Sequence, residues 1–310
     1  MAIPEDFFLL DAAPLAAVVL SASTLALLGS FLVLQRRAMI GDAMAHSVLP
    51  GLVVAFVLTG SRAPLPMFLG ALGAALVASL AISALTKHAR VEPTAAIGVV
   101  FTTFFALGVL LVETTGARNV DLDLDCVLSG QLELLFWPIE HGASPCSAAS
   151  LAALPQPIFT LAATLLATLV TLAFGWRLLR ASLFDPQFAS TRGLRPGLIR
   201  GVLLLLTTAT VIASFEALGS ILVIALLTCP PAAARLVTQR LSSYVILSAT
   251  LGAAAGLAGY AIATLAAPVV IGSAVDASGT VAATAGCILL ATALSTTLSR
   301  RPSSCADATP

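Results

Sequence analysis

Residues 94–112 read TAAIGVVFTTFFALGVLLV, a run without charged side chains that is long enough to decide the fold. A helix needs about 20 apolar residues to cross the hydrocarbon core of a membrane, which is roughly 30 Å thick. Comparable runs recur along the chain, near 12–34, 40–58, 64–85, 94–112, 158–178, 198–214, 218–236, 245–267 and 280–298. The sequence therefore predicts an all-α, polytopic transmembrane bundle of eight or nine spans in a single domain, residues 1–310.

The composition agrees with a protein surrounded by membrane lipid. Only 10% of the 310 residues are charged and 59% are hydrophobic, whereas a soluble domain carries roughly a quarter of charged residues. Fifteen Lys and Arg balance fifteen Asp and Glu. This zero formal charge argues against nucleic acid as a partner, because nucleic-acid binding needs a dense basic surface.

The positions of the charges predict the orientation, because cytoplasmic loops of membrane proteins collect Lys and Arg. An outside N-terminus places thirteen of the fifteen basic residues in inner loops: Arg36, Arg37, Lys87, Arg90, Arg177, Arg180, Arg192, Arg195, Arg200, Arg235, Arg240, Arg300 and Arg301. Most acids then lie outside, many in an outer loop at 113–156, part of which is apolar enough to pack back into the membrane. Fusing the sixth and seventh runs would move Arg235 and Arg240 outside, so nine spans fit the charges better.

The sixth and seventh runs are short, and we expect them to join at residues 215–217. We also expect the seventh to be interrupted at Cys229, Pro230 and Pro231, because two adjacent prolines remove helical hydrogen bonds. Such a defect is tolerated in a membrane only where neighbouring protein or a cavity satisfies the backbone. The segment is therefore expected to be internal.

Ionisable residues within the spans are the candidates for function, because a charge in hydrocarbon is costly. Asp42 and His46 are four residues apart, which places both on one helix face within reach of one ion. A carboxylate and an imidazole suit zinc, manganese or ferrous iron, although an Asp–His hydrogen bond between helices would explain the same spacing. Glu216 is either a further ligand or the cap of a half-helix. Glu92 is more simply an acid that favours a helix N-terminus.

A short segment on the inner side has the signals of a helix. Asp185 and Pro186 supply a cap and a first-turn proline, and Gly193 supplies a stop. They predict a short cytoplasmic helix near 183–193 with Phe184 and Phe188 exposed. This helix either packs on its own protein or docks a soluble partner.

Motif absences narrow the function. No GxxxxGK[ST] occurs, so the chain does not bind ATP through a P-loop, and no HExxH or GxSxG occurs. The chain is therefore expected not to be an enzyme, and energy for transport would come from elsewhere. The five cysteines form no CxxC pair; Cys126 and Cys146 share the outer loop, where a disulfide is one option.

A series of motifs, in order, carries a family resemblance. They are RRAMIGDAMAHSVLPG at 36–51, AIGVVF at 96–101 with FALGV at 105–109, DLD at 121–123 with CVLSG at 126–130, FDPQFA at 184–189, SFEALGSILV at 214–223 and PPAAA at 230–234. These segments resemble the permease subunits of ABC transporters that import zinc, manganese or iron. The resemblance extends over about residues 15–298.

The resemblance implies a type II-like importer permease in the bacterial plasma membrane, paired with a second permease chain that is either a copy or a paralogue. It implies ATPase subunits on the cytoplasmic side, where ATP is hydrolysed, and an extracytoplasmic binding protein that delivers the metal. No cofactor is bound permanently; manganese, zinc or iron is the cargo.

The resemblance also assigns roles to residues. Asp42 and His46 would form a transient metal site in the pathway, with Glu216 as a further ligand. The residues that would couple the ATPase to the permease lie in the inner segment: Phe184, Asp185, Phe188 and Gly193.

Two alternatives stay open. An ion-coupled secondary metal transporter would move metal without an ATPase. A permease for chelated iron, siderophores or cobalamin would share the partners, but it has less reason for the Asp42 and His46 pair. Ser242 and Ser243 stand where many manganese or iron members carry a histidine, which leaves the metal open.

Overall fold

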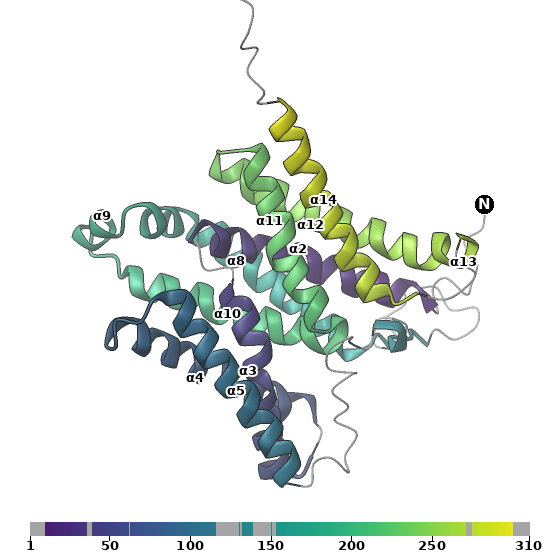
Figure 1. The fold of residues 1–310 in the computed structure, drawn as a ribbon, viewed down its shortest axis with the longest axis horizontal. Coiled ribbons are helices and arrows are strands. Elements are labelled where there is room, and N and C mark those ends of the chain that lie inside the picture. The colour runs from purple at the N-terminus through teal and green to yellow at the C-terminus, as the bar shows by residue number, and fades with distance from the viewer. Residues whose placement is uncertain are drawn as a thin grey trace, which may run out of the picture.

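The computed structural model describes residues 10–35, 39–61, 63–115, 130, 132–138, 150, 153–270 and 275–299. This part of the chain is helical and contains no strand (Figure 1). The long helices are α2 (Ala12–Leu34), α3 (Met39–Thr59), α4 (Pro64–Lys87), α5 (Pro93–Thr114), α8 (Gln156–Phe184), α10 (Pro196–Leu218), α11 (Ser220–Val237), α12 (Leu241–Ala261) and α14 (Ala277–Ser299). The short elements are η2 (Leu132–Leu134), α9 (Pro186–Thr191), the π-helical turn η3 (Ile262–Ala266) and α13 (Ala267–Val270).

Within the described residues, 8 helices are long and apolar enough to cross a membrane. Helix α3 has 21 residues and contains the apolar stretch Ser47–Thr59, so it occupies the place of a ninth span. The predicted all-α bundle of eight or nine spans is confirmed. Each expected run overlaps a long helix, and the run at 245–267 also includes η3 and the first residue of α13. Leu65, Leu166 and Leu294 are exposed on α4, α8 and α14, as expected where helices face lipid.

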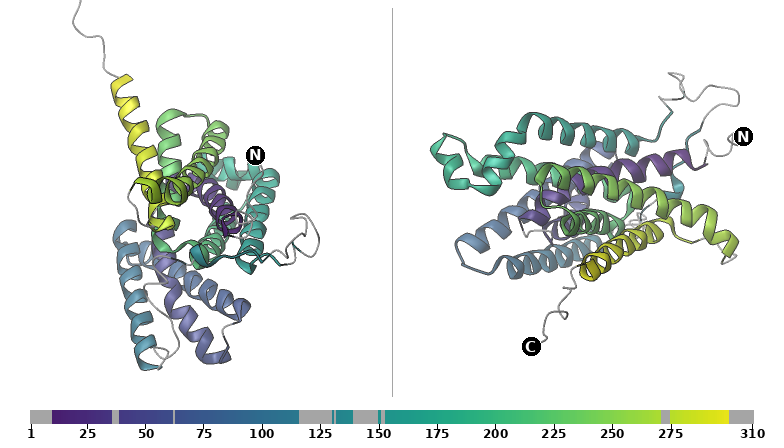
Figure 2. Two further views of the ribbon diagram at one scale, coloured as in Figure 1. Left: turned by 90° about the vertical axis from the view of Figure 1, so that its right-hand side faces the viewer. Right: turned by 90° about the horizontal axis from the view of Figure 1, so that it is seen from above.

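The helices form two groups that meet at α10. Helix α2 packs against α8, α10, α11 and α12, and α14 covers α11 and α12. Helices α3, α4 and α5 pack on one another and reach the first group mainly through α10 (Figures 1 and 2). Helix α10 therefore contacts both groups and joins them.

Helices α2 and α12 approach closely because small residues line their contact. A Cβ at Gly252 would lie 2.8 Å from the carbonyl oxygen of Ala22, which is closer than ordinary van der Waals contact. One turn earlier, the Ser248 hydroxyl donates a hydrogen bond of 2.7 Å to the Ala26 carbonyl. In a lipid environment, such close packing and buried hydrogen bonds hold helices together.

Helix α8 is longer than a membrane span requires. Its 29 residues extend about 43 Å at 1.5 Å per residue, against roughly 30 Å for the hydrocarbon core. It continues beyond the expected end at 178 to Phe184, so the short helix α9 begins at Pro186 and not at 183. The reason is local: Asp185 leaves the helical region (φ −141°, ψ 82°) and Pro186 cannot donate a backbone hydrogen bond.

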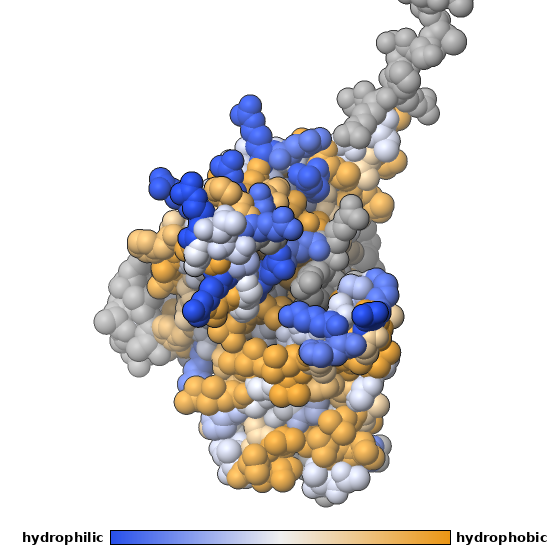
Figure 3. All heavy atoms as spheres, turned by 90° about the vertical axis from the view of Figure 1, so that its left-hand side faces the viewer, coloured by the Kyte–Doolittle hydropathy of each residue, from blue (hydrophilic) through white to orange (hydrophobic). Residues whose placement is uncertain are grey.

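Figure 3 views the molecule from the α9 side, where hydrophilic side chains gather beside apolar surface.

The expected joint between the sixth and seventh spans at 215–217 is wrong. Helix α10 continues through these residues to Leu218, and the break falls at Gly219 (φ 77°, ψ 167°). This backbone conformation is essentially restricted to glycine, so Gly219 decides where the helix ends. Glu216 consequently lies in the last turn of α10 and not between two helices.

The expected interruption at Pro230 and Pro231 is also wrong, because α11 continues through both prolines. Both are buried, which confirms that this segment is internal. The prolines lack N–H groups, so the carbonyl of Leu227 has no helical partner four residues ahead. Gly29 of α2 packs directly on that carbonyl, where a Cβ would overlap the oxygen. Neighbouring protein thus covers the defect.

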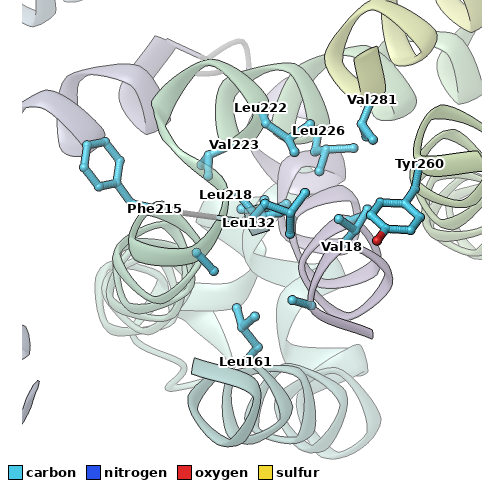
Figure 4. Close-up of a cluster of buried hydrophobic side chains, with 14 of the residues drawn as sticks. Val18, Leu132, Leu161, Phe215, Leu218, Leu222, Val223, Leu226, Tyr260 and Val281 are labelled. Atoms are coloured by element: carbon cyan, nitrogen blue, oxygen red, sulfur yellow. The ribbon is translucent and has the colours of Figure 1, made fainter. Parts of the chain in front are cut away.

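Part of the outer loop packs into the bundle. Leu132 and Leu135 are buried in one apolar cluster with Leu218 and Leu222 (Figure 4). An apolar part of the loop at 113–156 therefore packs on the helix bundle, and its expected return into the membrane stays a prediction. Other residues of interest lie outside the described part of the chain. They are the acidic stretch at 120–125, the cysteines of the suggested disulfide (Cys126 and Cys146) and four basic residues (Arg36, Arg37, Arg300 and Arg301).

Candidate functional site

Asp42 and His46 both lie on the first half of α3. Their spacing within one continuous helix puts both residues on the same helix face, as predicted. The side-chain atoms of Asp42, His46 and Glu216 fall outside the described part of the structure. Among the described side chains, no group of three or more His, Cys, Asp or Glu is placed to hold a metal ion.

The start of α3 is wedged between α10 and α11. Gly41, directly before Asp42, packs on the Leu227 side chain of α11, where a Cβ would overlap it. Met44 is fully buried, and the Thr208 hydroxyl of α10 donates a hydrogen bond to its sulfur at 2.8 Å. Contacts on two sides therefore fix the helix segment that carries the Asp42 and His46 pair.

Helix α10 contacts α3 and also carries Glu216, at another level along its axis. Thr208 marks the position on α10 that contacts α3. Glu216 is eight residues farther along, about 12 Å at 1.5 Å per residue. The structure thus brings together the helices that carry the three candidate ligands, and it separates Glu216 from the Met44 contact along α10.

Sequence reasoning did not single out the contact between Met44 and Thr208. Thr208 belongs to the sequence Thr207-Thr208-Ala209-Thr210 within an otherwise apolar span. All three hydroxyl residues are buried. A hydroxyl-rich turn in the middle of a span is the signal that could have identified this part of α10.

The short helix α9 has the cap and the stop that the sequence predicts. The Asp185 carboxylate accepts a hydrogen bond of 2.8 Å from the Phe188 backbone N–H. At the other end Gly193 has φ 75°, and its N–H donates to the Ser190 carbonyl at 3.0 Å. Phe184 and Phe188 are 61% and 50% exposed, although α9 is anchored to α8 and α10. The end of α8, with Phe184, and α9, with Phe188, therefore present two aromatic side chains to a partner or to solvent.

The surroundings of α9 are basic. The Arg192 guanidinium lies 5.3 Å from the centre of the Phe188 ring. Arg180, Arg195 and Arg200 are exposed on the adjoining ends of α8 and α10. The turn between α4 and α5, with Lys87 and Arg90, lies at the same end of the molecule in Figures 1 and 2. This concentration agrees with the side predicted to face the cytoplasm.

Glu92 is the N-cap of α5, one position before the first turn. Hydrogen bonds donated by the backbone N–H groups of Thr94 and Ala95 hold the pKa of its carboxyl below the ordinary value of 4.5. The Thr94 hydroxyl donates a further hydrogen bond of 3.0 Å. The structure therefore supports the simpler interpretation of Glu92, a carboxylate that stabilises a helix N-terminus.

Comparisons with known proteins give one consistent result. The model of the ABC 3 transport family matches residues 6–135 and 150–295. The manganese transport system membrane protein MntD of Bacillus subtilis (strain 168) is 38% identical over 239 residues, 77% of this chain and 78% of that protein. The zinc transport system membrane protein TroD of Treponema pallidum (strain Nichols) is 36% identical over 218 residues, 70% of this chain and 56% of that protein.

Solved structures agree with the fold. PsaBC from Streptococcus pneumoniae in complex with Fab superimposes with a TM-score of 0.69 at 24% identity, covering 90% of this chain and 89% of that chain. The superposition includes residues of both helix groups, because it covers 90% of this chain and 89% of the other. With a family model matched over nearly its whole length and relatives above 30% identity, the chain belongs to the ABC 3 transport family.

Proposed function

We propose that this chain is the membrane-spanning permease subunit of an ATP-driven importer for a divalent transition metal: manganese, zinc or iron. The observation that carries the proposal is the Asp42 and His46 pair on α3, at a helix start packed between α10 and α11. The printed names of the manganese and zinc transport relatives support the cargo class. A bacterial plasma membrane is the expected location.

The Asp42 and His46 pair suits a metal ion that the transporter must release after binding it. A carboxylate and an imidazole select transition metals over calcium, which prefers oxygen ligands only. Two ligands from one helix leave most of the coordination shell to water or to other residues, so binding is weak enough for onward movement. Glu216, about 12 Å beyond Thr208 on α10, is the further acid of the path.

The partners follow from the two ends of the molecule. ATP is hydrolysed on a separate cytoplasmic subunit that binds the end of α8 and α9 through Phe184 and Phe188, while Asp185 and Gly193 hold the shape of α9. A metal-binding protein delivers cargo on the opposite side, and a second permease chain, a copy or a paralogue, completes the pathway. The exposed phenylalanines and the basic surface around α9 support the position of the ATPase.

The test is metal accumulation in cells that carry Asp42→Ala or His46→Ala in place of the native chain. Both variants are expected to abolish accumulation of the transported metal under manganese, zinc or iron limitation. Assembly of the complex should be unchanged, because both variants keep the packing contacts of Gly41 and Met44. Normal accumulation by both variants would refute the site. Metal movement by the chain reconstituted without an ATPase would instead favour a secondary transporter.

A further inference from the structure

The outer loop contributes a segment that packs on the break between α10 and α11; we call residues 130 and 132–138 the outer segment. Gly130 and Gly219 both have left-handed backbone conformations, with φ 79° and 77°. The two backbones lie in direct contact, because a Cβ at Gly130 would overlap the Leu218 carbonyl carbon and the Gly219 nitrogen. Position 130 therefore tolerates no side chain, on grounds of both conformation and space.

Apolar side chains of the outer segment fill the space beside this contact. Leu132 is 2% exposed and lies in the cluster that contains Leu218 and Leu222 (Figure 4). The far end of the segment is held as well, since the Trp137 indole N–H donates a hydrogen bond of 2.8 Å to the Ser150 carbonyl. One side of the outer segment, with Leu132 and Leu135, is thus part of the core, whereas Leu134 and Phe136 are exposed.

The break at Gly219 joins two helices whose surroundings overlap only in part. Both α10 and α11 pack on α2 and α3; α10 packs in addition on α8 and α4, and α11 packs in addition on α12 and α14. Glu216 lies one turn before the break, so the backbone at Gly219 sets its position relative to α11. The outer segment belongs to the connection between α5 and α8, and α5 packs with α3 and α4. The helical turn η2 of the outer segment contacts α2 and α14.

We propose that Gly130 and Leu132 are positioning residues for the ion path. By packing on the α10–α11 break, they hold the end of α10 that carries Glu216. The transport part of this inference rests on the proposed function. The packing part concerns the permease alone and is tested separately.

The first test uses hydrogen exchange on the full chain in lipid nanodiscs. Gly130→Ala is compared with Gly60→Ala, which also replaces a glycine of positive φ (60°) but has nothing within 4 Å of the new Cβ. Backbone amides of residues 218–223 are expected to exchange about tenfold faster in Gly130→Ala and unchanged in Gly60→Ala. Equal exchange in the two variants overturns the proposal.

A second pair keeps the test decisive if Gly130→Ala does not fold. Leu132→Ala removes a buried side chain, whereas Leu134→Ala removes a side chain of the same turn that is 64% exposed. Leu132→Ala is expected to speed exchange at residues 218–223 about threefold, and Leu134→Ala not at all, because only the first leaves a cavity. Equal effects of the two variants overturn the proposal.

The functional test separates positioning from mere stability. In the assembled transporter, Gly130→Ala is expected to lower metal uptake about tenfold while ATP hydrolysis per complex persists. The reason is that the variant displaces the α10–α11 break but not the surface proposed to bind the ATPase. A proportional fall of uptake, hydrolysis and complex yield overturns the positioning role. Asp42→Ala, in contrast, should abolish uptake without changing exchange at 218–223, so failure of the proposed metal site is distinguishable from failure of this inference.

Discussion

The two breaks that flank α10 have nearly the same backbone φ and opposite surroundings. Gly193, before the helix, has φ 75° and is exposed, and a Cβ added there would have nothing within 4 Å. Gly219, after the helix, has φ 77° and is buried against Gly130. The first is a stop that leaves α9 exposed, and the second is part of the core. Glycine at positive φ thus ends an exposed helix on one side of α10 and forms a packed joint on the other.

The largest expected effect comes from placing a side chain at each break. Gly219→Ala should cost about 3 kcal/mol or more, because its conformation is nearly exclusive to glycine and its surroundings are packed. Gly193→Ala should cost only about 1 kcal/mol, the strain of a left-handed residue in open space. Thermal unfolding of the purified variants measures the difference. Equal losses of stability would contradict the contrast between the two breaks.

An intermediate effect is expected at the exposed surface of α9. Replacing Phe184 and Phe188 together by alanine should weaken binding of the ATPase subunit at least about tenfold, because exposed aromatic side chains often carry most of an interface's energy. Phe174→Ala is the matched control, since this side chain is 86% exposed on the membrane-spanning part of α8. Co-purification of the ATPase gives the measurement. Equal recovery with both variants would show that α9 is not the docking surface.

The smallest effect concerns the cap at the start of α5. The folded state lowers the pKa of Glu92, so the cap contributes stability above pH 4.5 and loses it as the pH falls through the lower folded pKa. Unfolding temperature measured from pH 6 down to about pH 3 should therefore fall slightly less steeply in Glu92→Gln than in the native chain. Superimposable pH profiles would show that this cap adds nothing to stability.

The spans were predictable because lipid imposes a simple rule. Every backbone group in hydrocarbon must be hydrogen-bonded within the protein, so each sufficiently long apolar run becomes a helix. The cap at Asp185 and the stop at Gly193 were also predictable, since both depend on neighbouring residues only. The sequence-based prediction misplaced the break at Gly219 because the drop in hydropathy at Glu216 resembles the end of a helix. Helix α10 instead carries this charged residue in its last turn and ends at Leu218.

The remaining features depend on residues far apart in sequence. Helix α11 continues through Pro231 because Gly29 of α2 covers the freed carbonyl. Thr208 reaches Met44 across a separation of 164 residues. Spacing alone put Asp42 and His46 on one face, but it contained no information on which helices oppose that face. Those contacts arise from packing between groups, which one sequence does not specify locally.

The length of α8 also fixes how deep the protein sits in its membrane. Arg177 and Arg180 lie on the part of the helix that outruns the hydrocarbon, and α9 follows without an intervening flexible connection. A thicker bilayer would draw these two cations toward the acyl chains, at a cost that resists sinking. The surface proposed to bind the ATPase is thereby kept above the lipid tails, where a soluble protein reaches it without entering the bilayer.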